Sequence, residues 1–517
     1  MSRSDAGLPA PVLRLRQGSY EGVYSAGAAS SSSSVRVQTF HSIPYARFTA
    51  RFQPLTPLSS ASTSASTNAT SSSSLLLDAK SRRAICPQGA SRLERLTGPL
   101  PSATPGLMEE EACALLSVYL PVDVSVSSRG KGAGAAAAGG NGAGSSGRNV
   151  MLFFHGGAYV TGGSEIPWYD ATGLASTAMP EEEGSENIII VASYRLGALG
   201  FLYDDDDEEA KKRMGAGAGA GAATTALGVD DCVKALQWVR DNAQALGADA
   251  SKITVFGQSA GAFTIQTLMD HPQALFDRAI LQSSPASTIL TSSQASKVAH
   301  DLIRALPPGS SPSNASMADL LSAQAKASSM NAAALNLVFA PVLEREAGGN
   351  AHQQQQQDQS GGSGSSAAAP GGRGKKALIG WNKEDAAVFV DLRLESYGVP
   401  AWARPAIVWA SQGLATYANF AQPNRRLASR LRAKGWEVTL YEFDWRPLRS
   451  PWKAAHCVEL PLLFGHEQQE AWKSAPMLGD EAWRDVQRRG ERWKEAWITF
   501  ANHGLINNNA FENFRIE

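Results

Sequence analysis

The sequence predicts an α/β protein with a large, mostly parallel central sheet and helices on both of its faces. Three observations lead to this fold class. Short, largely apolar runs recur along the chain, as in strands that are buried on both faces. Segments with apolar residues at helical spacing stand between these runs, which is the order of elements found in parallel sheets. The 517 residues, 43% hydrophobic and 18% charged, are enough to enclose one large core.

The elements follow one another in two blocks. In the first block, three apolar runs predict buried strands over residues 149–154, 188–192 and 252–256. Residues 230–246 carry apolar side chains at a period of 3.6 and predict an amphipathic helix before the third strand. The second block predicts a helix over 425–434, a strand over 436–443 and a long helix over 480–502.

Four segments are too poor in large apolar side chains to join a core. They are rich in Ser and Thr, in Gly and Ala, in charged residues or in Gln, and they cover residues 59–74, 129–148, 204–223 and 346–376. Each falls between predicted elements. We therefore expect disordered loop insertions in a single domain over residues 12–504, and no separate domains joined by linkers.

Composition excludes several classes of function. The formal net charge of −1 gives no concentrated basic surface for nucleic acid or an anionic membrane. No apolar stretch approaches the ~20 residues of a membrane-spanning helix, and the first residues show no signal peptide, so a cytoplasmic location is expected. The four cysteines lack the paired spacing of a zinc site, so we expect no metal.

The candidate nucleophile is Ser259, in the pattern Gly-Gln-Ser-Ala-Gly over residues 257–261. This pattern alone also fits a tight structural turn. Its position is more informative, because it directly follows a predicted strand and precedes a run that can form a helix. Glycines two residues before and after a serine allow a sharp turn that exposes the serine hydroxyl above the sheet, as in a nucleophile elbow.

A second glycine motif, His155-Gly156-Gly157, follows the predicted strand 149–154. Attack on a carbonyl group requires hydrogen-bond donors for the developing oxyanion, and backbone N–H groups beside glycine suit this role. The order of the two motifs fits an oxyanion hole made of the amides of Gly156, Gly157 and Ala260. A flexible glycine turn is the alternative interpretation of the first two residues.

With these motifs in place, the chain resembles the type-B carboxylesterases, the cholinesterase-like branch of the α/β-hydrolase fold. Further segments look like landmarks of that family in the family's order: residues 42–46, 51–52, 86–88, 111–113, 193–201, 231–239 and 275–283. The resemblance covers nearly the whole chain outside the insertions.

The resemblance implies a catalytic triad in the order Ser, acid, His. The segment Ala455-His456-Cys457-Val458-Glu459 resembles the family's histidine loop, so His456 takes the role of general base. The family's acid stands five residues after the glycine of Ile379-Gly380, which selects Asp385, although the family more often has glutamate there. The adjacent Glu384 is the alternative.

The resemblance also matches Cys86 and Cys113 to a family disulfide. The sequence leaves open whether the bond forms, because a reducing compartment would keep both thiols free.

The implied function is that of a serine hydrolase that cleaves carboxylic esters through an acyl-enzyme intermediate, without a cofactor. The 71 residues from Asp385 to His456 are fewer than the family usually has. In the family this segment forms helices that wall the substrate pocket. A shorter segment therefore predicts a more open pocket, for a small-molecule ester with a small to medium acyl chain. A non-catalytic binding or adhesion protein of the same family is the alternative function. The sequence does not indicate an oligomeric state.

Overall fold

The computed structural model describes residues 9–26, 35–58, 76–99, 108–123, 147–179, 182, 185–203, 226–273, 275–285, 290–331, 337–342, 372, 374–466, 471–506 and 514–516. The predicted loop insertions 59–74, 129–148, 204–223 and 346–376 lie outside these residues, apart from 147–148, 372 and 374–376. The single domain over 12–504 remains a prediction.

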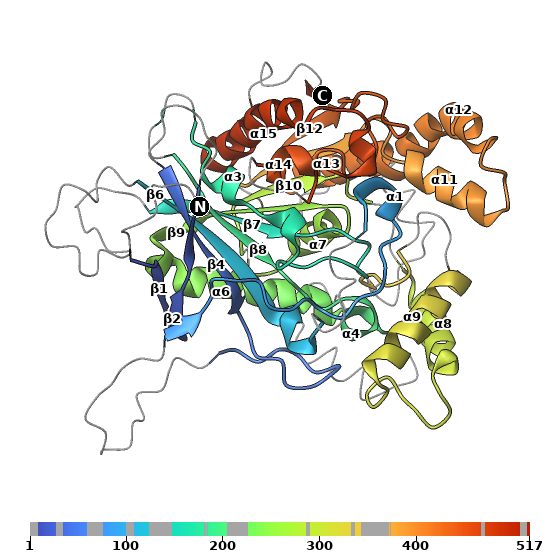
Figure 1. The fold of residues 1–517 in the computed structure, drawn as a ribbon, viewed down its shortest axis with the longest axis horizontal. Helices are drawn as coiled ribbons and strands as arrows, with labels where there is room; N and C mark the ends of the chain where they lie inside the picture. The colour runs from blue at the N-terminus through green and yellow to red at the C-terminus, as the bar shows by residue number, and fades with distance from the viewer. Residues whose placement is uncertain are drawn as a thin grey trace, which may run out of the picture.

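A ten-stranded sheet in the order β13-β12-β11-β10-β9-β7-β8-β6-β4-β3 runs through the molecule (Figure 1). The strands from β12 to β8 run parallel to their neighbours, whereas β13 at one edge and β6, β4 and β3 at the other are antiparallel. A small second sheet contains β1, β2 and β5. The prediction of parallel strands is confirmed for the centre of the sheet, and the antiparallel edges were not predicted.

The strand bounds are β1 Val12–Leu15, β2 Gly18–Glu21, β3 Val23–Ala26, β4 Val35–Pro44, β5 Leu76–Asp78, β6 Leu115–Asp123, β7 Arg148–Phe154, β8 Ile188–Ala192, β9 Ala248–Gln258, β10 Arg278–Gln282, β11 Lys376–Asn382, β12 Glu437–Phe443 and β13 Phe514–Ile516. The four predicted strands are thus β7, β8, β9 and β12, with ends displaced by a few residues.

The helix bounds are α1 Glu94–Thr97, η2 Glu110–Ala114, η3 Pro167–Tyr169, α3 Thr172–Ala175, α4 Gly197–Phe201, α6 Leu227–Leu246, α7 Ala260–Leu268, α8 Ser292–Ala305, α9 Met317–Asn331, α11 Ala387–Ser396, α12 Arg404–Thr416, η4 Tyr417–Ala421, α13 Gln422–Ala433, α14 Leu460–Phe464, η5 Pro476–Leu478 and α15 Trp483–His503. The predicted helices are α6, α13 and α15. Within the described ranges, no helix combines the length and the apolar character needed to cross a membrane.

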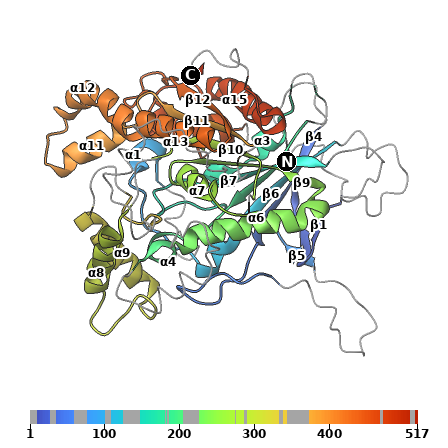
Figure 2. The ribbon, with the colours of Figure 1, turned by 180° about the vertical axis from the view of Figure 1, so that it is seen from behind.

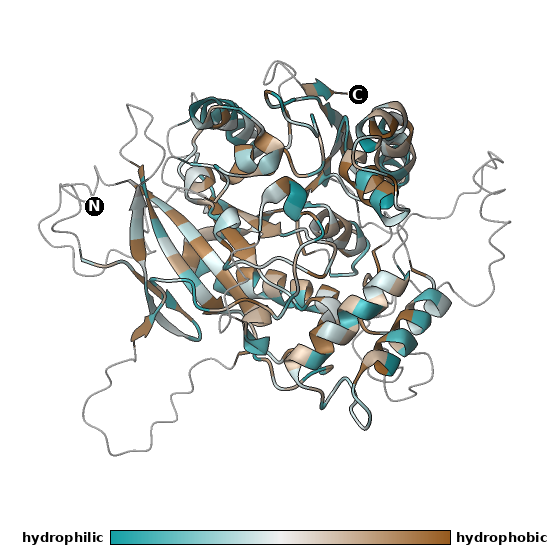
Figure 3. Ribbon diagram, turned by 45° about the vertical axis from the view of Figure 1, so that its right-hand side comes forward, coloured by the Kyte–Doolittle hydropathy of each residue, from teal (hydrophilic) through white to brown (hydrophobic). Residues whose placement is uncertain are grey.

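Both faces of the central strands are buried over most of their length, which explains their largely apolar sequences. Successive side chains of a strand point to opposite faces. Leu152 and Phe154 of β7 lie in the core cluster that contains α6 and α7, while Met151 and Phe153 lie in the cluster that contains α14 and α15. Figure 2 shows α6 and α15 on opposite sides of the sheet, and Figure 3 shows hydrophobic residues along its strands.

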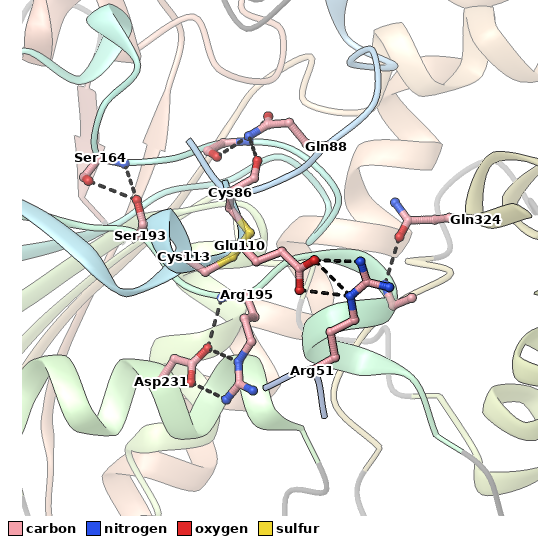
Figure 4. The surroundings of a disulfide bond; sticks show 12 residues. Arg51, Cys86, Gln88, Glu110, Cys113, Ser164, Ser193, Arg195, Asp231 and Gln324 are labelled. Carbon is pink, nitrogen blue, oxygen red and sulfur yellow. Dashed lines mark hydrogen bonds and ion pairs between the residues drawn. A yellow bond between two sulfur atoms is a disulfide. The ribbon is translucent and has the colours of Figure 1, made fainter. Parts of the chain in front are cut away.

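A disulfide and a buried ion pair lie close together near the carboxyl end of β8 (Figure 4). The disulfide joins Cys86 to Cys113, which is the pairing that the resemblance implies. The ion pair joins Arg195 to Asp231 of α6, with Nη2 at 2.6 Å from Oδ1 and Nε at 2.8 Å from Oδ2. Both side chains are fully buried. Because neither charge reaches water, each depends on the other for its stability.

Replacing Asp231 by alanine is expected to lower the free energy of unfolding by about 3–5 kcal/mol, because Arg195 would stay buried without a counter-ion. Urea denaturation measures this loss. The matched control is Asp241→Ala, since Asp241 lies 3.8 Å from Arg16 and both side chains are about two-thirds exposed. That loss should stay below about 1 kcal/mol. Equal losses in the two variants would contradict the importance of the buried pair.

Candidate active site

Ser259 lies in the turn between the end of β9 and the start of α7. Its backbone has φ 56° and ψ −120°, a conformation that a non-glycine residue rarely adopts outside functional turns. Two glycines make the turn possible. A Cβ atom on Gly261 would lie 1.9 Å from the carbonyl oxygen of Phe154, and one on Gly257 would lie 2.8 Å from the same oxygen. The turn therefore packs against the end of β7 at a distance that only glycine permits.

Gly156 and Gly157 follow β7 and face this turn. A Cβ atom on Gly156 would lie 3.2 Å from the Cβ of Ser259, and one on Gly157, where φ is 108°, would lie 2.1 Å from the oxygen of Thr161. Within the described part of the chain, the amides of Gly156, Gly157 and Ala260 donate no backbone hydrogen bond. These three N–H groups, two in the loop that faces Ser259 and one directly after Ser259, thus have no backbone acceptor.

His456 is held by Asp385. The Nδ1 atom of His456 lies 2.6 Å from Oδ1 of Asp385, and both side chains are fully buried. The second oxygen of Asp385 accepts a hydrogen bond of 2.9 Å from the amide of Asn382. Glu384 points elsewhere, because its Oε1 accepts a hydrogen bond of 2.6 Å from Nη2 of Arg446. Of the two candidate acids, Asp385 is the one that contacts the imidazole.

The other ring nitrogen of His456 is in contact with Gln258. Its Nε2 atom lies 3.1 Å from Nε2 of the Gln258 side chain. If the Nδ1–H group donates to Asp385, the Nε2 lone pair accepts from the Gln258 amide. Among the hydrogen bonds of the described residues, none joins His456 to Ser259. Sequence analysis did not single out Gln258, although its polar side chain directly precedes Ser259 in the elbow.

A pocket lined mostly by apolar side chains opens above Ser259. Its walls come from the loop after β7, from residues 91–93, and from Phe389 of α11 and Phe420 of the π-helix η4. The rings of Phe389 and Phe420 also pack on the His456 ring, with centroids 5.0 Å and 5.5 Å away. The pocket walls were not predicted, because these residues lie on helices remote in sequence and carry no motif.

A second buried carboxyl group, Glu459, lies beneath the imidazole three residues after His456. Its Oε2 accepts a hydrogen bond of 2.6 Å from Nδ2 of Asn382, and its Oε1 has no partner. Burial raises the pKa of the Glu459 carboxyl to about 7, and the negative charge of Asp385 acts in the same direction. Glu459 therefore holds a proton over much of the neutral pH range, which limits the negative charge beside Asp385.

Two other candidate groups are structural. Burial lowers the pKa of His155 to about 4, and its ring stacks on Tyr194 with centroids 4.3 Å apart, so a neutral imidazole packs beneath the glycine loop. Burial raises the pKa of the Cys457 thiol, which keeps it protonated beside His456. In the described ranges, no three His, Cys, Asp or Glu side chains are grouped in a way that could hold a metal ion.

Comparisons with known proteins identify the family of this chain. A profile of the Carboxylesterase family matches residues 9–403, which include Ser259 and Asp385 and end before His456. A probable N-octanoylanthranilate hydrolase of Rhodococcus erythropolis is 29% identical over 437 residues, which cover 83% of each chain. The para-nitrobenzyl esterase of Bacillus subtilis strain 168 is 27% identical over 457 residues, or 83% of this chain and 80% of that protein.

A solved structure of a PNB esterase is similar over 98% of this chain and 97% of its own, with a TM-score of 0.68 and 23% sequence identity. The match places this chain in the α/β-hydrolase fold.

Glu459→Gln is expected to change how stability depends on pH. A carboxyl group with a pKa of about 7 in the folded state and about 4.5 in the unfolded state stabilises the fold fully below pH 4.5. This contribution is lost as the pH rises through 7. Between about pH 5 and pH 8, the wild type should lose roughly 1–3 kcal/mol relative to the variant, which keeps an acceptor for Asn382.

Denaturation midpoints at several pH values measure this difference. The control Glu437→Gln alters a carboxylate of β12 whose side chain is 67% exposed, and it should follow the wild type. Parallel curves for wild type and Glu459→Gln would show that Glu459 is ionised in the folded protein.

Proposed function

The chain belongs to the carboxylesterase family and is a carboxylic-ester hydrolase, and from this premise we propose that Ser259, His456 and Asp385 form its catalytic triad. Ser259 is the nucleophile, His456 the general base and acid, and Asp385 the group that orients the imidazole. The amides of Gly156, Gly157 and Ala260 form the oxyanion hole. No cofactor takes part in this chemistry.

In the first step, Nε2 of His456 accepts the hydroxyl proton of Ser259 while Oγ bonds to the ester carbonyl carbon. The oxyanion hole stabilises the negative charge on the carbonyl oxygen. The bond to the alkoxy oxygen then breaks, and His456 gives its proton to the leaving alcohol. Water, activated by the same nitrogen, attacks the acyl-enzyme and releases the carboxylate together with free Ser259.

Gln258 has to release the imidazole before the first step. Its amide occupies the Nε2 lone pair at 3.1 Å, and that lone pair accepts the proton of Ser259. A side-chain rotation of Gln258 is enough, because hydrogen bonds of catalytic groups are often arranged differently in substrate-free sites. Gln258 therefore competes with Ser259 for the base in the resting enzyme.

The observation that carries the triad assignment is the buried contact of 2.6 Å between His456 and Asp385. The two phenyl rings that pack on this imidazole also line the pocket that contains Ser259. The nucleophile thus lines an apolar cavity, and the base lies behind the two rings that form part of its wall. The alternative of a non-catalytic binding protein is not favoured, because the chain retains a serine, a histidine and an acid for acyl transfer.

The proposed substrates are small-molecule esters with small to medium acyl chains. Support comes from the lining of the pocket, in which the bulky side chains of Phe389, Phe420 and Leu337 accompany Ser259. The cytoplasmic location expected from the sequence also stays a proposal. The Cys86–Cys113 disulfide weighs against it, because such bonds are rare in reducing compartments.

Ser259→Ala should abolish turnover of p-nitrophenyl butyrate, with kcat reduced by about 10⁴-fold or more, because no other side chain can take the acyl group. Covalent labelling by a fluorophosphonate should vanish in parallel. A folded wild-type protein that neither turns over nor reacts with the probe would support the binding-protein alternative. Circular dichroism confirms that both proteins are folded.

Asp385→Asn should lower kcat by roughly 10³–10⁴-fold, because an amide no longer stabilises the imidazolium that forms during attack. Glu384→Gln is the matched control one residue away. It should change kcat less than about threefold, since Glu384 contacts Arg446 and not His456. If the larger loss appears in Glu384→Gln, the acid has been assigned to the wrong carboxylate.

Activity on p-nitrophenyl esters should peak on acyl chains of about ten carbons or fewer, because large phenyl rings line the pocket that contains Ser259 and would crowd a longer chain. Comparison of kcat/KM for acetate, butyrate, decanoate and longer esters measures the profile. The control is Phe389→Ala, which enlarges the pocket and should shift the peak to longer chains. A wild-type maximum beyond ten carbons would contradict the proposed substrate class.

A further inference from the structure

The α11–α12 hairpin exposes an unusual set of large apolar side chains. Within the described part of the chain, half of the exposed large hydrophobic residues lie in the 21 residues from 397 to 417. They are Tyr397, Trp402, Ile407, Trp409, Leu414 and Tyr417, which we call the hairpin apolar surface. Trp402 is 85% exposed, Leu414 76% and Trp409 72%. Large apolar side chains exposed together on one hairpin are typical of an interaction site.

The position of α12 explains why these side chains are not in the core. Its main neighbours are α11 and η4, and the hairpin projects from one corner of the molecule (Figures 1 and 2). Thr416 is its one buried residue. A helix that is apolar on most sides is normally buried, so the exposure of α12 is unusual. Its apolar side chains are available to another phase or molecule.

The charge pattern indicates what covers this surface. Residues 405–424 contain no Asp, Glu, Lys, Arg or His. The helix then continues into α13, where Arg426 and Arg430 are exposed and have no acidic partner among the described residues. Aromatic and aliphatic side chains followed by arginines are typical of segments that lie in a membrane interface, with indole rings at the headgroup level and cations near anionic lipids.

We propose that the hairpin apolar surface docks this protein on phospholipid membranes that contain anionic lipids. The formal net charge of −1 led us to expect no anionic membrane as a partner. That value is a sum over the whole chain, and it does not reflect the local separation of apolar and basic side chains. The side chains enter the headgroup region, and the helix lies along the surface without spanning the bilayer. This inference goes beyond ester hydrolysis and does not depend on it.

Docking would also place the pocket next to the lipid. Phe389 at the start of the hairpin and Asn419 and Phe420 at its end line the pocket of Ser259. Tyr417, which is 49% exposed, is two residues from Asn419. On the proposed function, lipophilic esters dissolved in a membrane would reach the pocket along this surface.

Vesicle co-sedimentation tests the proposal, with vesicles made of phosphatidylcholine and phosphatidylglycerol in equal amounts. The wild type should pellet with the vesicles, and it should bind vesicles of phosphatidylcholine alone more weakly. The variant Trp402→Ser/Trp409→Ser/Leu414→Ser should bind roughly tenfold or more weakly, because it removes three apolar side chains from the interface. Arg426→Glu/Arg430→Glu should lose the preference for anionic vesicles.

The matched control is Met330→Ser/Leu448→Ser/Leu505→Ser. These side chains are 61%, 59% and 64% exposed on other parts of the molecule. The control variant should bind vesicles like the wild type. Thermal melting shows whether each variant is folded, so the readout is independent of esterase activity.

Three outcomes would overturn the proposal. The first is a wild-type protein that stays in the supernatant with both kinds of vesicle. The second is an equal loss of binding in the control variant. The third is a wild-type dimer in sedimentation velocity that the Trp402→Ser/Trp409→Ser/Leu414→Ser variant dissociates, without any binding to vesicles. In that case, a second copy of the chain covers the hairpin.

Discussion

The arrangement of the site depends on one close contact between two backbone turns. The turn after β9 approaches the end of β7 so closely that a methyl group on Gly261 would overlap the carbonyl oxygen of Phe154. This contact places Ser259 beside the amides of Gly156 and Gly157. A single larger residue at either turn would separate the hydroxyl from those amides. The close packing of the two turns therefore requires glycine at these positions, independently of any catalytic role.

The parallel centre of the sheet gathers the remaining groups. Strands β7, β9 and β11 end at the same edge, and the loops that follow them carry Gly156, Ser259 and Asp385. The loop after β12 brings His456 to that edge. Ligand sites of open parallel sheets generally lie outside the carboxyl ends of the strands, because loops from several strands converge there. Polar side chains are thus concentrated at one edge, above a sheet that is apolar on both faces.

Sequence reasoning succeeded where local pattern determines structure. The apolar runs of β7 and β8 and the helical period of α6 predicted elements that the structure contains, because both faces of each strand or one face of the helix are buried. It failed for features that depend on contacts between remote segments. The antiparallel edges, the aromatic walls from Phe389 and Phe420, and the hydrogen bond from Gln258 to His456 have no local signature.

The distribution of the site along the chain has a consequence for protein synthesis. Gln258 and His456 are in contact although 198 residues separate them. Domains generally fold as units during synthesis, and a contact of this range forms only after both segments have left the ribosome. Ser259 is therefore made long before its proposed base. On the proposed triad, a nascent or prematurely terminated chain would carry the nucleophile without the base that activates it, and unfinished copies would not hydrolyse esters.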